Sequence, residues 1–154
     1  MLKSRFEIFI DTDIFLDHLT GTKKEESLLL KCLKIFDCFT SVINASEIFY
    51  GCAGNSQREK AKHSFYGTGV LGIPYKYSLR IGEVLKKIEE RKLKNTYRDA
   101  VITAVCIETN LPFLTLNEKK YSHLSGIFKL KLISKECIIQ NNSPEIIFKK
   151  AKIL

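Results

Sequence analysis

The sequence lacks the long segments that mark membrane and fibrous proteins. It has no apolar run of membrane-spanning length, no low-complexity tract and no internal repeat. Its first residues cannot serve as the apolar region of a signal peptide, because acidic residues interrupt them at positions 7, 11, 13 and 17. These absences favour a globular protein that works in the cytoplasm without contacting a membrane.

Clustered metal-binding cysteines and histidines are missing as well. The five cysteines form no C-x-x-C pair, and the three histidines are scattered at positions 18, 63 and 123. This spacing excludes the usual zinc sites. We expect the cysteines to be reduced residues of the core, since four of the five lie among apolar neighbours.

What the sequence does contain is an ordinary globular composition with an excess of positive charge. Hydrophobic residues make up 45% of the chain and charged residues 27%, which is typical of a folded protein. A length of 154 residues suits a single domain spanning 1–154. The formal net charge of +8 favours polyanionic partners such as nucleic acid.

Strand and helix patterns alternate along the chain. Short β-branched and aromatic runs predict five strands, at residues 6–12, 38–43, 69–75, 113–116 and 130–133. Helical periodicity and capping residues predict helices at 14–19, 23–36, 44–53, 57–66, 78–93, 98–110 and 143–154. The alternation predicts an α/β fold of three layers, α/β/α, with a central and mostly parallel sheet of about five strands.

Three acidic residues fall near the carboxyl ends of these strands, where doubly wound sheets form their sites. Asp11 ends the first strand, Glu47 follows the second, and Asp99 opens the helix before the fourth. Converging carboxylates repel one another and are stable mainly with a cation between them. An all-oxygen set of ligands selects Mg²⁺ or Mn²⁺. With a basic surface, this predicts phosphodiester hydrolysis by metal-activated water.

Each of these acids also has a local interpretation. Asp13 suits the N-cap of the helix that follows the first strand, whereas Asp11 lies one residue earlier than a cap requires. Glu47 stands three residues after Asn44, the offset of a capping box. Asp99 could simply favour a helix N-terminus by its charge. These interpretations explain the acids one by one but not their common position at strand ends.

In order and spacing, four segments together resemble a PIN domain, specifically the VapC-type toxin ribonucleases of prokaryotic toxin–antitoxin pairs. They are IFIDTDIFLDHLTG, TSVINASEIFYGC, RDAVITAVCIETNLPFLTLN and the tyrosine of LNEKKY. The resemblance covers about residues 6–133, and residues 134–154 follow it as a C-terminal tail of strand and helix. It implies a single PIN-like domain.

The resemblance also implies an activity. Members of this kind are Mg²⁺- or Mn²⁺-dependent endoribonucleases, and the matching positions make Asp11, Glu47 and Asp99 the metal-binding catalytic residues. Four further residues match supporting positions of the site: Thr12, Asp13, Thr115 and Asn117. The implied partners are an RNA substrate, a small antitoxin protein that occludes the site, and a second copy of the chain in a homodimer.

The sequence departs from the family at a fourth acid. Many members carry it where this chain has Asn117 or Lys120. Asn117 offers a carbonyl oxygen but no charge, so a second metal ion would bind weakly, and Glu118 could substitute only if its loop turns inward. Lys119 and Lys120 are either contacts for substrate phosphate or a solvated pair. The alternative function is therefore a degenerate PIN domain that binds RNA or a protein partner without cleaving.

Two other families with doubly wound sheets fit less well. A receiver domain needs an aspartate at the end of its third strand, and GVLGIPYKY has none. A nucleotide-binding domain needs a glycine-rich phosphate loop after its first strand. At that place IDTDIFLDHL supplies acids, which repel phosphate.

Overall fold

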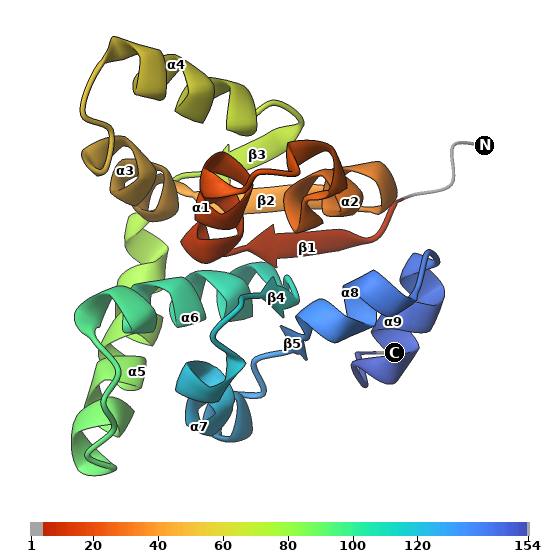
Figure 1. Ribbon diagram of the computed structural model, residues 1–154. Helices are drawn as coiled ribbons and strands as arrows, with labels where there is room; N and C mark the ends of the chain where they lie inside the picture. The colour runs from red at the N-terminus through yellow and green to blue at the C-terminus, as the bar shows by residue number, and fades with distance from the viewer. Residues whose placement is uncertain (1–4, 154) are drawn as a thin grey trace.

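A five-stranded sheet between two layers of helices forms the frame of the molecule (Figure 1), as a computed structural model of residues 5–153 shows. The strand order is β3-β2-β1-β4-β5, and every neighbouring pair is parallel. The strands are β1 (Glu7–Ile10), β2 (Asp37–Ser41), β3 (Thr68–Leu71), β4 (Phe113–Leu114) and β5 (Leu132–Ile133). The predicted α/β/α architecture with a parallel sheet is thereby confirmed.

The helices follow the strands in alternation. They are α1 (Thr12–Thr20), α2 (Leu28–Ile35), α3 (Val42–Tyr50), α4 (Asn55–Ser64), α5 (Ser78–Glu90), α6 (Tyr97–Thr109), α7 (Glu118–Phe128), α8 (Lys135–Gln140) and α9 (Pro144–Lys150). Two 3₁₀ turns, Lys24–Glu26 and Tyr75–Tyr77, precede α2 and α5. Within residues 5–153, no helix has the length and apolar character needed to cross a bilayer.

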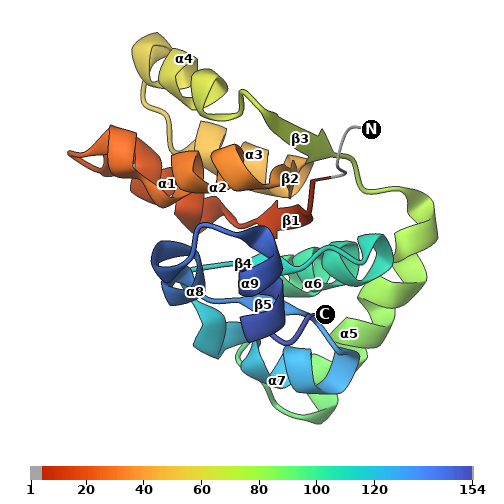
Figure 2. The ribbon, with the colours of Figure 1, turned by 90° about the vertical axis from the view of Figure 1, so that its right-hand side faces the viewer.

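The sheet separates two hydrophobic cores. Ile8 and Ile10 of β1 point into the core formed with α1, α2, α8 and α9, and Phe9 between them points into the core formed with α5, α6 and α7. In Figure 2, α1 and α2 lie on one side of the sheet and α5 on the other. A strand covered on both faces is apolar along its whole length, which explains the uninterrupted run of β1.

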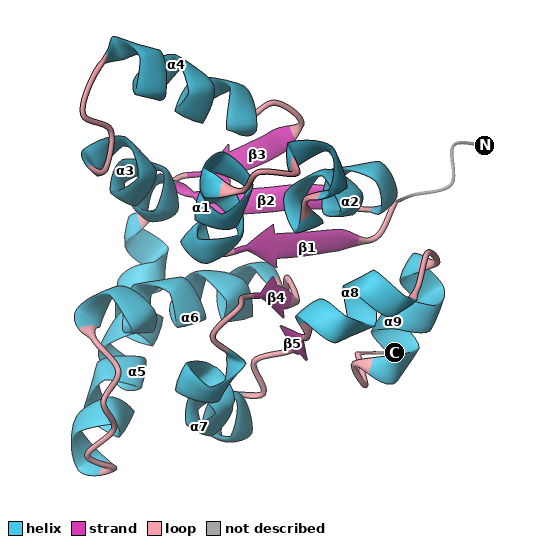
Figure 3. Ribbon diagram, viewed as in Figure 1, coloured by secondary structure: helices cyan, strands magenta, loops and turns pink. Residues whose placement is uncertain are grey.

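Several predicted boundaries were wrong for local reasons. The helix expected over 23–36 is divided at Ser27, whose hydroxyl caps α2 by accepting a hydrogen bond from the Leu30 N–H over 3.3 Å. No helix was expected over α7 or α8, and both are present. Figure 3 shows that β4 and β5 are much shorter than β1, β2 and β3.

The C-terminal tail packs on the body of the domain as two helices. Phe148 of α9 is buried and stands 4.7 Å from Phe6 and 5.8 Å from Phe36, measured between ring centroids. Ile138 and Ile147 join the same core. The strand expected at 130–133 pairs with β4 over two residues, and the chain after it is helical.

Strand order reverses between β1 and β4, because the crossover from β1 leads to β2 on one side while β4 lies on the other. In parallel sheets, ligands bind outside the carboxyl ends of the strands at such a switch point. Asp11 directly follows β1, and Thr115 directly follows β4. The fold therefore brings these two side chains to the edge where a site is expected.

Candidate functional site

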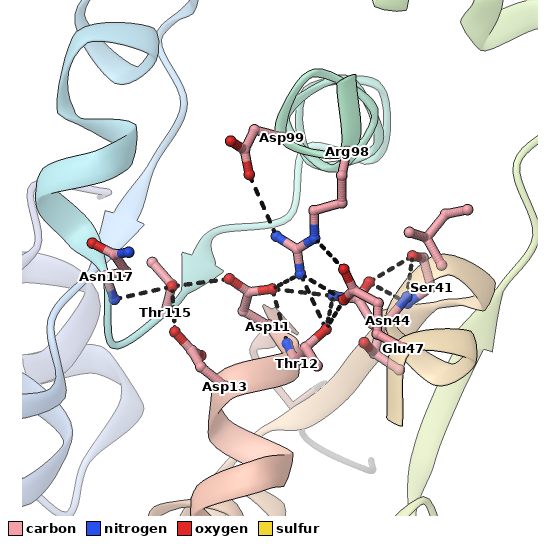
Figure 4. Close-up of polar contacts among 12 residues, drawn as sticks. Asp11, Thr12, Asp13, Ser41, Asn44, Glu47, Arg98, Asp99, Thr115 and Asn117 are labelled. Atoms are coloured by element: carbon pink, nitrogen blue, oxygen red, sulfur yellow. Dashed lines mark hydrogen bonds and ion pairs between the residues drawn. The ribbon is translucent and has the colours of Figure 1, made fainter. Parts of the chain in front are cut away.

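The centre of this edge is a guanidinium group. Arg98, the second residue of α6, reaches between the carboxylates of Asp11, Glu47 and Asp99 (Figure 4). Its nitrogens lie 2.5 Å from Asp11 Oδ1, 2.9 Å from Glu47 Oε1 and 3.8 Å from Asp99 Oδ1. The three acids predicted to surround a cation thus surround one that the chain itself provides.

Asp11 is held by four donors. Its Oδ1 accepts hydrogen bonds from the Thr12 N–H (2.8 Å), Asn44 Nδ2 (3.1 Å) and Arg98 Nη2, and its Oδ2 accepts one from Thr115 Oγ1 (2.9 Å). The carboxylate is almost fully buried, so these bonds replace the water that it loses. Asp11 is also the N-cap of α1, and the prediction that Asp13 caps this helix was wrong.

Glu47 forms a two-pronged ion pair with Arg98. Arg98 Nε donates to Oε1 and Nη2 donates to Oε2, both over 2.9 Å, and the Thr12 hydroxyl donates a short bond to Oε2. Burial raises the pKa of Glu47, but the bonds from Arg98 and Thr12 outweigh burial and hold that pKa below its ordinary value. Burial lowers the pKa of Arg98, but its hydrogen bonds to Glu47 and Asp11 and the charge of Asp11 outweigh burial and raise that pKa.

The interpretation of Glu47 as the end of a capping box was wrong. The capping box of α3 joins Ser41 to Asn44, because α3 begins at Val42. Asn44 therefore has two roles. Its Oδ1 accepts hydrogen bonds from Ser41 at the start of α3, and its Nδ2 donates to Asp11 and to Thr12 Oγ1 (3.0 Å). Glu47 lies further along α3 and is free to face Arg98.

Asp99 lies behind Arg98 and is fully buried. Its Oδ2 accepts the Thr96 N–H in a capping box over 2.8 Å, so the predicted role at the start of a helix is real. Its Oδ1 lies 2.8 Å from Lys120 Nζ and accepts the Tyr121 hydroxyl over 2.9 Å. Burial raises the pKa of Asp99, but Lys120, the Thr96 N–H and Tyr121 together lower it below the ordinary value.

Tyr121 connects two halves of the site. Its hydroxyl accepts a hydrogen bond from Arg98 Nη1 over 2.7 Å while it donates to Asp99. Burial is the main reason that the pKa of Tyr121 is raised, and the nearby Asp11 charge adds to it. The hydroxyl therefore stays protonated and keeps its role as a donor to Asp99.

Asp13 and Thr115 lie on the other side of Asp11. The single hydroxyl proton of Thr115 faces Asp11 Oδ2 and Asp13 Oδ2, each 2.9 Å away, and it can serve only one of them at a time. Asp13 Oδ2 also accepts the Leu116 N–H over 2.9 Å, and the Asn117 N–H donates to Thr115 Oγ1 over 3.2 Å. Burial, and then the charge of Asp11, raise the pKa of Asp13.

An open cleft of ≈ 500 Å³ gives access to these groups. Its lining includes Asp11, Asp13, Glu47, Arg98 and Asn117. Asn117, predicted as a supporting residue, lines the cleft and holds Thr115 through its backbone. Lys120 lines the cleft too and is paired with Asp99, which means that it is not simply a solvated lysine.

The donor set fits a hard divalent cation in kind and in charge. Its donor atoms are carboxylate oxygens, with no cysteine or histidine among them, and this is the ligand set that Mg²⁺ and Mn²⁺ prefer. Four carboxylates (Asp11, Asp13, Glu47, Asp99) face two cations (Arg98, Lys120), which leaves a formal charge of −2. Asp13 Oδ1 is buried and has no hydrogen-bond partner among residues 5–153, so negative charge there is incompletely compensated.

The arrangement is nevertheless not that of a ready metal site. Nowhere in residues 5–153 do three histidine, cysteine or acidic side chains stand together as ligands of one ion. The Arg98 guanidinium lies where the carboxylates meet, and Lys120 forms an ion pair with Asp99. The acids predicted from strand ends have come together, but around a guanidinium.

Sequence reasoning missed Arg98, Asn44 and Tyr121 as parts of this network. One signal could have found Arg98. A positive charge in the first turn of a helix opposes the helix dipole, so an arginine there indicates an acidic partner elsewhere in the fold. Asn44 had been considered only as a helix cap.

Comparisons with known proteins agree with this fold. A family model for the PIN domain matches residues 8–126. The chain matches none of the curated protein sequences. Among solved structures, VapBC2 from Rickettsia felis, bound to a DNA fragment from its promoter, has a TM-score of 0.68 at 18% identity, over 84% of this chain and 98% of that chain.

Two further structures are similar. VapBC-1 from nontypeable Haemophilus influenzae has a TM-score of 0.69 at 14% identity, over 84% of this chain and 98% of that one. A toxin–antitoxin complex from Klebsiella pneumoniae has a TM-score of 0.57 at 22% identity, over 77% and 93%. At such identities the likeness concerns the fold.

Proposed function

The chain belongs to the PIN domain family, and we propose that it is a VapC-type toxin, an endoribonuclease that depends on Mg²⁺ or Mn²⁺. The observation that carries this proposal is the convergence of Asp11, Glu47 and Asp99 on the Arg98 guanidinium at the carboxyl edge of the sheet. The excess of −2 among the charged groups suits a divalent ion. The net charge of +8 on the whole chain suits an RNA substrate.

In this proposal Asp11, Glu47 and Asp99 hold the metal ion. When bound there, the ion supplies an activated water and stabilises negative charge on the phosphoryl group. The other residues keep the ligands in place. Thr12 and Asn44 fix the facing oxygens of Asp11 and Glu47, and Thr115 holds Asp11 beside Asp13.

We further propose an antitoxin and a second copy of the chain as partners. The three similar solved structures described above are two VapBC proteins and a toxin–antitoxin complex. A small protein bound over the cleft would control access to it. The homodimer is proposed from the family resemblance alone.

Purified protein incubated with structured RNA and Mg²⁺ or Mn²⁺ tests the activity. We expect cleavage that EDTA abolishes and that Asp11→Asn abolishes. The matched control is Asp17→Asn, which removes a carboxylate from the exposed face of the same helix and should cleave like the wild type. Cleavage that survives EDTA or Asp11→Asn would contradict a metal-dependent nuclease.

The alternative, a degenerate PIN domain that binds RNA or a protein without cleaving, has one observation in its favour. Both positions of the family's fourth acid are non-acidic, and Lys120 forms an ion pair with Asp99 instead. RNA binding by filter retention or fluorescence anisotropy, with no cleavage in Mg²⁺ or Mn²⁺, would favour this alternative.

A further inference from the structure

The Arg98 guanidinium is almost saturated by the groups around it. Nε and Nη2 donate to the two oxygens of Glu47, Nη2 also faces Asp11 Oδ1 and Thr12 Oγ1 (3.0 Å), and Nη1 donates to Tyr121. A two-pronged pair of this kind is among the strongest that side chains form, because both hydrogen bonds are charge-assisted and parallel. The cleft is therefore built to hold the guanidinium of Arg98.

The two cations compete for the same lone pairs. Asp11 Oδ1 already accepts bonds from Thr12, Asn44 and Arg98, and both oxygens of Glu47 are used by Arg98. A divalent ion bound between Asp11 and Glu47 would need these oxygens. Two positive groups at that position would also repel each other across a partly buried site.

Arg98 has room to leave. Its side chain is 23% exposed and borders the open cleft, and its place in the first turn of α6 gives it no stabilisation from the helix dipole. Asp99 does not depend on it, because Lys120, Thr96 and Tyr121 hold that carboxylate. Displacement of one side chain would thus open Asp11 and Glu47, two of the three proposed ligands, while the bonds of Thr96 and Tyr121 to Asp99 stay.

We propose that Arg98 competes with the divalent cation for the same carboxylates. In the metal-free protein Arg98 occupies Asp11 and Glu47, and it must be displaced before the ion binds. The inference rests on the proposed function only for the identity of the ion. It predicts that this chain binds Mg²⁺ and Mn²⁺ more weakly than its own carboxylates would in the absence of Arg98.

Binding of Mn²⁺ measured by titration calorimetry tests the proposal without reference to activity. Arg98→Met removes the charge and retains an unbranched stem in place of the arginine's, and we expect it to lower the dissociation constant about tenfold or more, the equivalent of one lost charge-assisted bond. Arg98→Lys keeps the charge but not the two-pronged pairing, so its dissociation constant should lie between those of Arg98→Met and the wild type.

Arg80→Met is the matched control. Arg80 also pairs with more than one carboxylate, those of Glu83 and Glu108. They lie on α5 and α6 outside the cleft, so the loss of Arg80 should leave the Mn²⁺ affinity unchanged. Melting temperatures provide a second measurement. In EDTA, Arg98→Met should melt below the wild type because carboxylates lose their partner, and Mn²⁺ should raise its melting temperature by more than it raises that of the wild type.

The outcomes separate this proposal from the proposed function. An Arg98→Met protein that binds Mn²⁺ no more tightly than the wild type overturns the role of Arg98, even where the wild type cleaves RNA. Tighter binding without cleavage by any variant supports the role of Arg98 and contradicts the nuclease. If Arg98→Met does not fold in EDTA, Arg98→Lys with unchanged affinity would also overturn the proposal.

Discussion

Arg98 and Glu47 face each other edge to edge, with Nε–Oε1 and Nη2–Oε2 both at 2.9 Å. We expect Glu47→Gln to lower the free energy of unfolding in EDTA by about 1–2 kcal/mol, because the amide presents N–H groups to a guanidinium that can only donate. Relief of repulsion among the carboxylates is the smaller effect, since Arg98 already offsets part of it. Urea denaturation measures the change.

Glu108→Gln is the control for Glu47→Gln. Glu108 pairs with Arg80 Nε over 2.9 Å and is exposed to a similar degree, 29% against 35% for Glu47. It makes no two-pronged contact, so we expect a loss of a few tenths of a kcal/mol. Equal stability of Glu47→Gln and the wild type would show that the pair does not stabilise the metal-free fold.

Lys120 forms an ion pair with a fully buried carboxylate, that of Asp99. Lys120→Met should lower the free energy of unfolding at pH 7 by about 1–2 kcal/mol, because Asp99 then keeps a charge with fewer partners. Lys119→Met removes a neighbouring exposed lysine and should change it by less than about 0.5 kcal/mol. Equal effects of the two changes would contradict a specific role for Lys120.

The same variant alters the response to acid. The pKa of Asp99 is lowered in the folded state, so its contribution to stability is present above the unfolded value of 3.8 and is lost as the pH falls through the lower folded value. Without Lys120 the folded pKa moves up toward 3.8. Lys120→Met should therefore lose less stability than the wild type between about pH 5 and pH 2, as measured by thermal unfolding at each pH.

The sequence predicts the sheet well because its strands stand out as short apolar runs, most clearly β1, which is buried on both faces. Helix α7 was not predicted because its apolar face is narrow. Tyr121 and Leu124 are its only fully buried residues, and serine and glycine interrupt the helical pattern. At Ser27 the sequence predicts too much helix, because one helix was expected where the structure has a 3₁₀ turn followed by α2. The Ser27 hydroxyl caps α2, and the Ser27 backbone N–H donates to the Lys24 carbonyl, which ends the preceding 3₁₀ turn.

The acids of the site are predictable from a general rule, and their partner is not. Asp11 and Thr115 follow strands at a switch point, which sequence can identify once the strands are known. Arg98 lies 87 residues from Asp11 and 51 from Glu47, and no local period links them. Side-chain pairs across separate elements depend on the packing of α6 against the sheet, which only the fold specifies.

The C-terminal helix α9 offers a test of stability that leaves the cleft alone. Phe148 is 5% exposed and packs between Phe6 and Phe36, so Phe148→Ala should lower the free energy of unfolding by about 3–4 kcal/mol. Ile146→Ala, on the exposed side of the same helix, should cost less than about 1 kcal/mol. Similar losses for both would mean that the tail does not pack as described.

Asp13 should destabilise the metal-free fold at neutral pH. Burial, and then Asp11, raise its pKa in the folded state, so its favourable contribution exists below the unfolded value of 3.8 and is lost as the pH rises through the folded pKa. Asp13→Asn removes the charge and keeps an oxygen that can accept the Leu116 N–H. In EDTA at pH 7, this variant should be more stable than the wild type by a few tenths to about 1 kcal/mol.

The gain from Asp13→Asn must depend on pH if charge is its cause. As the pH falls toward 3.8, the wild-type carboxyl becomes protonated and the difference between the two proteins should shrink. Asp17→Asn, on the exposed face of α1, should show no such trend. A gain that stays constant from pH 7 to pH 4 would point to packing or hydrogen bonding instead. A loss of stability at pH 7 would mean that the Thr115 hydroxyl depends on a charged Asp13.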